Sequence, residues 1–312
     1  MVRRPAVRES AAKESATLCG VQVPAPKIIW VASYPKSGNT WMRILLTNYL
    51  RDASVPADIN QLEGGPIASA RACFDEWAGI EASALDDGVI EQLRPQIFRC
   101  LLSEAADTLY MKVHDAWGCT IRGDALFPAD VTAGVVYMLR NPLDVASSCS
   151  HHWGVSMAQA VENLCAPGFA VARSRSRDGL ADQLRQRLRC WTGHAQSWLK
   201  ESGLPVHLVR YEDLRRDPEA VFGGVVRFCG LPWDAARVRK AVTFSDFSEL
   251  RDQEQTNGFR ERPLRSSGAF FRSGKSGSWR DELPLDLAEQ VIHTHRASMR
   301  HFGYLDENNL PV

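Results

Sequence analysis

The sequence predicts an α/β fold in which a central parallel β-sheet is flanked by helices on both faces. Short apolar runs alternate with segments of helical pattern along most of the chain, and this alternation is typical of a parallel sheet covered on both sides. Residues that carry chemistry follow directly where the apolar runs end, which is the edge at which parallel sheets bind ligands. With 312 residues, the chain is long enough for one large domain of this kind or two small ones.

The expected elements follow in order along the chain. Strands are expected at 28–33, 108–113, 134–140 and 205–210. Helices are expected at 40–52, 142–149, 182–202, 218–229 and 284–302. Two of these helices have a clear start signal, because Asn141-Pro142 and Asp217-Pro218 each place a capping side chain before a proline at the first helical position.

Two stretches, 53–107 and 150–181, give no clear assignment. The second contains a basic run at 173–177, which is expected to be a solvated loop. A mobile lid over a substrate is the alternative. Residues 1–24 are expected to form a flexible arm, 25–306 the domain, and 307–312 a C-terminal tail.

Composition and charge exclude several classes of protein. The 37 basic residues balance the 37 acidic ones, which argues against a nucleic-acid binder because such proteins carry a basic surplus. No apolar run approaches the ~18 residues that span a bilayer, and residues 1–20 lack the apolar core of a signal peptide. The eight cysteines form no CxxC pair. They are expected to be reduced, in a cytoplasmic protein.

The segment SYPKSGNTW at 33–41 follows the first expected strand and is the most informative stretch of the chain. Its lysine, glycine and small polar residues are typical of a turn whose backbone N–H groups surround an anion at a helix N-terminus. It is no Walker A loop, because the lysine precedes the glycine. The alternative is an ordinary turn with a surface lysine. The anion-binding residues expected here are Lys36, Ser37, Gly38, Asn39, Thr40 and Trp41.

Lys112 and His114 end the second expected strand. Residues two apart in a strand point to the same side, so both side chains can face one pocket. A nearby cation disfavours the imidazolium form, so His114 is expected to be a neutral base. The alternative is a partly buried histidine bonded to a loop carbonyl.

Arg140 ends the third expected strand, and Ser148 lies two turns into the following helix. The planar guanidinium can donate two parallel hydrogen bonds to phosphate oxygens, which favours a phosphate site here. The alternative is a surface ion pair between Arg140 and Asp144.

Aromatic residues mark two further segments. Tyr211 follows the fourth expected strand, and considered alone it is expected to be a core tyrosine. The segment 270–280 reads FFRSGKSGSWR. Its Gly-Lys-Ser is not a Walker A end, because Gly268 stands at the wrong spacing and no clear strand leads into it.

Taken together and in this order, the five segments resemble the motifs of sulfotransferases that use 3′-phosphoadenosine 5′-phosphosulfate (PAPS), in particular the cytosolic type. The resemblance spans residues 28 to about 280 and implies a single P-loop-like domain. It implies a general base at His114, assisted by Lys36, Lys112 and Ser148. The nucleotide-binding residues it implies are the six of the 33–41 segment together with Arg140, Ser148, Tyr211, Phe247, Phe270, Phe271, Arg272, Ser273 and Gly274.

The sequence also departs from the family pattern. Asn39 stands where many members have threonine, and Ser273 replaces the usual lysine, with Lys275 nearby as a substitute cation. The family's dimer motif is matched poorly by 280–289, where Pro284 takes the threonine position. Dimerisation by that route is therefore not expected, and the oligomeric state stays open.

The reaction that the resemblance implies is transfer of a sulfuryl group from PAPS to a hydroxyl or amine of an acceptor, expected to be a small molecule, without a metal ion. A kinase that uses ATP and magnesium is the main alternative, and a nucleotide-binding module without catalysis is a third. Two histidine pairs, His151-His152 and His293/His295, lack partners at metal-ligand spacing and are expected to be surface or lid residues. At least half of four aromatic candidates for an acceptor pocket are expected to be core residues: Phe74, Trp77, Trp117 and Trp153.

Overall fold

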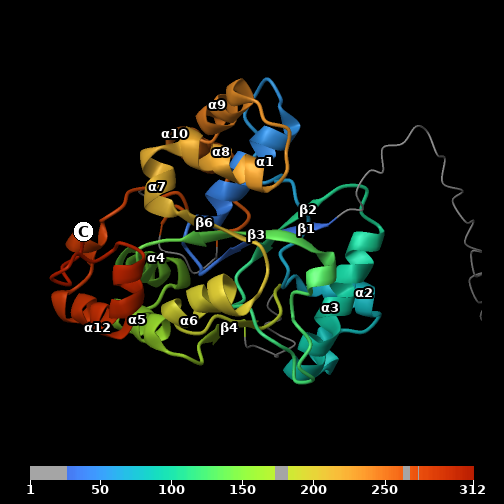
Figure 1. Cartoon of the computed structure of the whole chain (residues 1–312), viewed down its shortest axis with the longest axis horizontal. Helices are drawn as coiled ribbons and strands as arrows, with labels where there is room; N and C mark the ends of the chain where they lie inside the picture. Colours follow the sequence, from blue (N-terminus) through green and yellow to red (C-terminus); the bar gives the residue numbers. More distant parts are fainter. Residues whose placement is uncertain (1–26, 173–181, 263–267, 273) are drawn as a thin grey trace, which may run out of the picture.

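The computed structural model describes residues 27–172, 182–262, 268–272 and 274–312. Within these ranges the chain forms a four-stranded sheet in the order β2-β1-β3-β6, with every pairing parallel and helices on both faces (Figure 1). The strands are β1 (Ile28–Ser33), β2 (Leu109–Val113), β3 (Thr132–Leu139) and β6 (Val206–Arg210). The expected fold class is therefore confirmed, and each strand lies within two residues of its expected bounds.

The strand register brings four carboxyl ends to one edge of the sheet. Ala32 of β1 lies opposite Val113 of β2, and Ser33 lies opposite Met138 of β3. Leu139 of β3 in turn lies opposite Arg210 of β6. The segments that follow these strands must therefore meet, which is the geometry that places ligands at the carboxyl edge of an open parallel sheet.

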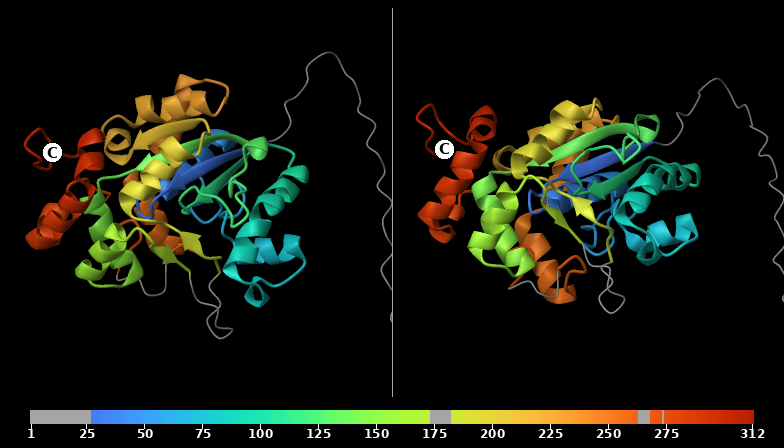
Figure 2. Two further views of the ribbon diagram at one scale, coloured as in Figure 1. Left: turned by 60° about the horizontal axis from the view of Figure 1, so that its bottom comes forward. Right: turned by 90° about the horizontal axis from the view of Figure 1, so that it is seen from below.

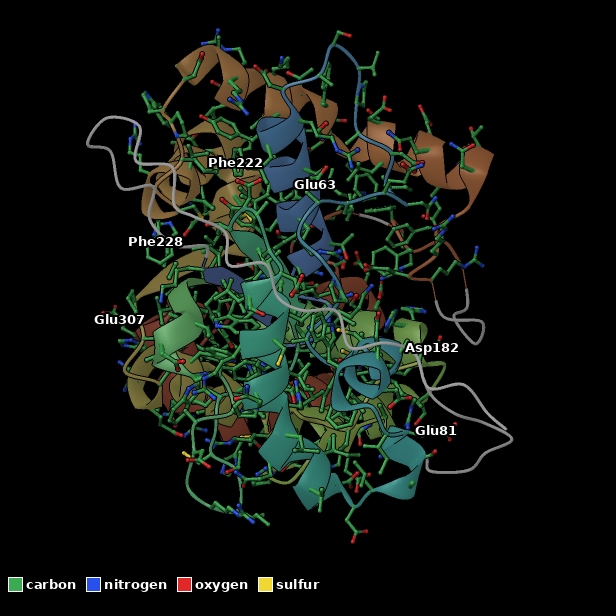
Figure 3. All side chains as sticks on the ribbon, turned by 90° about the vertical axis from the view of Figure 1, so that its right-hand side faces the viewer. Glu63, Glu81, Asp182, Phe222, Phe228 and Glu307 are labelled. Carbon is green, nitrogen blue, oxygen red and sulfur yellow. The ribbon has the colours of Figure 1, made fainter. Side chains whose placement is uncertain are left out.

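The two faces of β1 belong to two separate cores. Trp30 points to a core shared with Phe98, and its ring lies edge-on to Phe98 with centroids 5.0 Å apart. Val31 points the other way, into a core shared with Met42 and Phe222. Phe222 is labelled in Figure 3. All six residues of β1 are buried, which is why the strand reads as a continuous apolar run rather than an alternating one.

Helices cover the sheet on both sides (Figure 2). The Val31 face is covered by α1 (Asn39–Arg51), α8 (Pro218–Phe228) and α9 (Ala235–Phe244). The Trp30 face is covered by α3 (Asp87–Ser103), α4 (Pro142–Trp153) and α6 (Trp191–Gln196), and α12 (Leu285–His301) packs on α4 and α6 and extends the same core. The remaining helices are α2 (Arg71–Ala78), α5 (Met157–Cys165), α7 (Tyr211–Arg216), α10 (Phe247–Asn257) and α11 (Trp279–Glu282). Short elements complete the fold: β4 (Ala170–Val171), which pairs antiparallel with β5 (Gln186–Arg187), two 3₁₀ turns (Ala82–Ala84 and Ala129–Val131) and a π-helical turn (Ser197–Glu201).

Both expected helix caps form. The Asn141 side chain accepts a hydrogen bond from the Leu143 amide at 3.0 Å. The Asp217 side chain accepts one from the Ala220 amide at 3.1 Å. Each cap satisfies a backbone donor that the first turn of a helix leaves unpaired.

One expected helix is wrong in its first half. Residues 182–190 are not helical and include β5, and helix begins only at Trp191. Buried Leu184, Gln186 and Leu188 alternate with Arg185 and Arg187, and this period of two is that of a strand. The two arginines pair with the buried carboxylate of Glu91 on α3, at 2.7 Å for Arg185.

The two ends of the chain differ in what the structure describes. The expected arm at 1–24 and the basic run at 173–177 lie outside the described residues. The tail at 307–312 folds back on the end of α12, where the Leu310 amide donates to Asp306 at 2.8 Å and the Val312 amide to the Tyr304 carbonyl at 3.2 Å. Over the described ranges, none of the helices is both long and apolar enough to cross a bilayer.

Candidate active site

The loop between β1 and α1 is tightly folded against its neighbours. Lys36 and Gly38 have positive φ values of 69° and 100°, and a Cβ atom on Gly38 would lie 2.8 Å from the Tyr211 ring. Glycine is therefore required at this position. The Asn39 side chain donates to the Val31 carbonyl at 2.7 Å and so ties the start of α1 to β1. Ser37 is buried, and its hydroxyl has no partner among the described residues.

Lys36 brings a perturbed ammonium group to the cavity at this edge. Burial lowers its pKa to about 8, and the charges of Arg140 and Lys112 act in the same direction. Its Nζ lies 3.8 Å from the centroid of the Phe270 ring, a cation–π contact. Ser148 lines the same cavity, but no hydrogen bond joins it to Lys36 among the described side chains.

His114 is held as a neutral imidazole with one nitrogen free to accept a proton. Its Nδ1 lies 2.9 Å from the Ser33 carbonyl oxygen, and a carbonyl only accepts, so Nδ1 carries the hydrogen and Nε2 does not. Burial and the neighbouring Lys112 charge hold the His114 pKa well below its ordinary value. Lys112 and His114 line the same cavity, as their spacing predicted.

Two buried contacts that sequence reasoning missed fix the segment that carries His114. His194 Nε2 donates to the His114 carbonyl at 3.1 Å, and its Nδ1 accepts from the Tyr137 hydroxyl at 2.8 Å. Arg94 forms a two-pronged ion pair with Asp115, with both N–O distances 2.9 Å and both side chains 2% exposed. No local pattern marks these residues, because each partner lies far away in the sequence.

Arg140 joins the first loop to the segment after Phe271. Its guanidinium donates to the Lys36 and Lys275 carbonyls, each at 3.1 Å, and lies 4.4 Å from the centroid of the Tyr211 ring. Asp144 makes no ion pair with it among the described side chains. It instead accepts from the backbone amides of Gly277 at 2.8 Å and Trp279 at 3.1 Å, so it anchors the start of α11.

Aromatic rings form one wall of the cavity. Trp41 and Tyr211 meet edge to face with centroids 5.8 Å apart, and the Trp41 indole donates to the Ser245 carbonyl at 2.9 Å. Gly274 has a φ of 58°, and a Cβ there would lie 2.5 Å from the Phe247 ring. The backbone and the ring can be this close only because position 274 is a glycine.

The segment after α10 is fixed by carboxylates. Glu254 is 6% exposed and accepts the backbone amides of Phe270 at 2.6 Å and Phe271 at 2.8 Å. Arg272 pairs with Glu282 at 2.8 Å. Ser273, the remaining residue expected in this segment, lies outside the described residues.

A single cavity of about 970 Å³ collects most of the expected site residues. Those that line it are Lys36, Gly38, Asn39, Thr40, Trp41, Lys112, His114, Arg140, Ser148, Tyr211, Phe247, Phe270, Phe271, Arg272 and Gly274. Cavity-lining charged residues that sequence reasoning missed are Arg43, Asp182, Arg215, Arg260, Glu261 and Arg262. Glu261 stands between two arginines in a charged segment, a pattern that reads as a solvated loop.

The aromatic and histidine candidates divide between cavity and core. Trp153 lines the cavity, whereas Phe74 and Trp77 belong to a separate core and Trp117 packs against the main one. The four histidines were expected to be surface or lid residues, and this is wrong for His295, which is 1% exposed and whose Nδ1 lies 2.9 Å from the Thr192 hydroxyl. His152 lines the cavity. In the part of the chain that the structure describes, no three His, Cys, Asp or Glu side chains cluster as metal ligands.

Comparisons with known proteins agree with this geometry. Residues 124–303, more than half of the chain, match a family model described as a sulfotransferase domain. Human sulfotransferase 2B1 is 26% identical over 276 residues, which cover 87% of this chain and 66%, just under two thirds, of that protein. Cattle (Bos taurus) sulfotransferase 1A1 is 25% identical over 287 residues, which cover 87% of this chain and 83% of that protein.

Solved structures share the fold. Mouse sulfotransferase SULT7A1, complexed with PAP, superposes with a TM-score of 0.55 at 16% identity, over 88% of this chain and 85% of that one. Retinol dehydratase, in complex with androsterone and the inactive cofactor PAP, superposes with a TM-score of 0.57 at 19% identity, over 90% of this chain and 83% of that one. With a matched domain over more than half of its residues, the chain belongs to the PAPS-dependent sulfotransferase family.

Proposed function

We propose that this protein transfers the sulfuryl group of PAPS to a hydroxyl or amine of a small-molecule acceptor, with His114 as the general base. The observation that carries the proposal is the state of His114, whose Nδ1 is committed to the Ser33 carbonyl while Nε2 stays unprotonated in a cation-lined cavity. A base in this state can accept the acceptor's proton at neutral pH.

The step is a direct in-line displacement. The acceptor oxygen or nitrogen forms a bond to sulfur while the bond from sulfur to the bridging phosphate oxygen breaks. The acceptor's proton passes to His114 Nε2, and 3′-phosphoadenosine 5′-phosphate (PAP) leaves with the electrons of the broken bond. Lys36 and Lys112 would stabilise the negative charge on the sulfuryl oxygens and the leaving phosphate.

The residues present fit PAPS as the co-substrate. The loop at 33–41 brings the Lys36 ammonium to the cavity for the phosphosulfate, while the buried, unpartnered Ser37 hydroxyl lies in the same loop but is not among the cavity-lining residues. The rings of Trp41, Tyr211 and Phe247, which line the cavity, would contact the adenine. Arg140 and Arg272 would bind the 3′-phosphate, which would compete with the carbonyl and carboxylate groups they now contact.

The acceptor would occupy the part of the cavity beyond His114. The cavity-lining residues outside the segments assigned to the nucleotide include Pro66, Ile67, Trp153, Val171 and Gln186, a mixture of apolar and polar groups that suits a small molecule. The ligands named for two solved neighbours, androsterone and retinol, are also small molecules.

The cytoplasmic location suggested by the cysteine spacing remains part of this proposal, and fractionation of expressing cells tests it.

Calorimetric titration tests the co-substrate. The purified protein is titrated with PAP, and separately with ATP in the presence and absence of magnesium. Tight, magnesium-independent binding of PAP together with weak binding of ATP is the expected result. Magnesium-dependent binding of ATP without a response to PAP would replace the sulfotransferase proposal with the kinase alternative.

A further inference from the structure

Glu261 places a carboxylate directly among the cations of the cavity. Its Oε2 accepts from the Lys112 ammonium at 2.8 Å and from the Thr40 hydroxyl at 3.3 Å. Its Oε1 accepts from the Arg43 guanidinium at 2.6 Å. The side chains of Lys112 and Arg43 are only 13% and 9% exposed and that of Glu261 is 29% exposed, so the two cations are largely desolvated and the carboxylate partly so.

These donors would be shared with the co-substrate. Lys112 is one of the cations that the proposed function assigns to the sulfuryl group, and Thr40 lies in the first turn of α1, beside the loop assigned to the phosphosulfate. Glu261 remains ionised, because the attraction of Lys112 and Arg43 outweighs its burial and holds its pKa far below the ordinary range. Two anions at one ammonium group repel each other strongly in a site of low dielectric.

We propose that the Glu261 carboxylate and the sulfuryl group of PAPS compete for Lys112 and Thr40. The carboxylate holds both donors until PAPS displaces it, and it returns once the sulfuryl group has left with the acceptor. Glu261 is thus a positioning residue that keeps Lys112 paired before and after transfer, since a buried cation without a partner is costly. This inference rests on the proposed function.

PAP and PAPS distinguish this competition from a general electrostatic effect. The two nucleotides carry nearly the same net charge at neutral pH, because the 5′-phosphate of PAP is close to doubly ionised. Only PAPS has a sulfuryl group to place at Lys112. Loss of the Glu261 charge should therefore favour PAPS over PAP, whereas a distant charge effect would strengthen the binding of both nucleotides alike.

The experiment is calorimetric titration of the wild type and Glu261→Gln with PAPS and with PAP, without acceptor. We expect the ratio of the PAP to the PAPS dissociation constant to rise about tenfold in the variant, the effect of one charge-assisted hydrogen bond. Glu63→Gln is the matched control. Glu63 pairs with Arg51 at 2.6 Å outside the cavity-lining set and is labelled in Figure 3, so its loss should leave the ratio unchanged.

Glu261→Asp keeps the charge but shortens its reach, and it should move the ratio in the same direction by a smaller factor. This variant is the test if thermal melting shows that Glu261→Gln does not fold. A ratio that is unchanged or lower in the folded variants would overturn the competition while leaving the proposed function intact. A wild-type protein that binds neither nucleotide would overturn both.

Discussion

The proposed function divides the cavity lining into two halves that are built in different ways. The nucleotide half is built largely from segments that directly follow strands, such as 33–41 after β1 and Arg140 after β3, and it is completed by residues that follow no strand: Phe247, Phe270, Phe271, Arg272 and Gly274. The acceptor half is assembled from segments that follow no strand of the main sheet, such as 65–67 and 171–172. The residues at strand ends are fixed by the register of buried strands, so they can be located from local sequence. The other residues depend on packing between distant segments.

His114 lies between the two halves, where the proposed base would meet both the acceptor and PAPS. Its replacement should therefore reduce turnover more than any other change. In His114→Ala, turnover should fall by about 10²- to 10⁴-fold, the usual contribution of a general base, while PAP affinity stays close to that of the wild type. Turnover is followed as PAP release from PAPS, with an acceptor found in a panel of hydroxyl and amine compounds. The control is His293→Ala, which removes an exposed imidazole from α12. Turnover within tenfold of the wild type would reject His114 as the base.

Arg140 tests the nucleotide half alone. Arg140→Met removes the two guanidinium donors that would bind the phosphate. It also removes the hydrogen bonds by which Arg140 links the Lys36 carbonyl of the first loop to the Lys275 carbonyl. PAP should bind about 10- to 100-fold more weakly. The affinity for adenosine 5′-phosphate, which lacks the 3′-phosphate, should fall much less. An equal loss for both nucleotides would show that Arg140 acts by holding the loops rather than by contacting the 3′-phosphate.

The difference between the halves also shows what the sequence could predict. Strand ends, helix caps and the neighbours Lys112 and His114 follow from patterns within about ten residues, and the structure places them as expected. The sequence did not predict the ion pairs of Glu261 or the Arg94–Asp115 pair. The local sequence around a single charged residue is the same whether its side chain contacts water or a distant side chain. The extended stretch 182–190 was mistaken for helix because Arg185 and Arg187 find their partner on α3.

Lys36 links nucleotide binding to pH. Its pKa of about 8 in the free protein means that the ammonium form, which attracts the anionic nucleotide, is depleted as the pH rises above that value. PAP affinity should therefore be flat near pH 7 and fall by up to about tenfold per pH unit above about pH 8, as measured by titration between pH 6.5 and 9.5. Lys36→Arg provides the control, because a guanidinium stays protonated throughout this range. A wild-type profile as flat as that of the variant would contradict the role of this charge.

Trp153 tests the acceptor half and should give the smallest effect. It lines the cavity and meets Phe169 edge to face with ring centroids 5.6 Å apart, so Trp153→Leu keeps some of the packing while removing part of the wall. The KM for an apolar acceptor should rise about three- to tenfold, the loss of about 1 kcal/mol of apolar contact. The dissociation constant for PAP should not change, because Trp153 is not among the residues assigned to the nucleotide. A change in both constants would show that the two halves are coupled. His152, which precedes Trp153 in the chain, provides a route, because its ring centroid lies 6.0 Å from that of Phe270 and the Phe270 ring contacts Lys36.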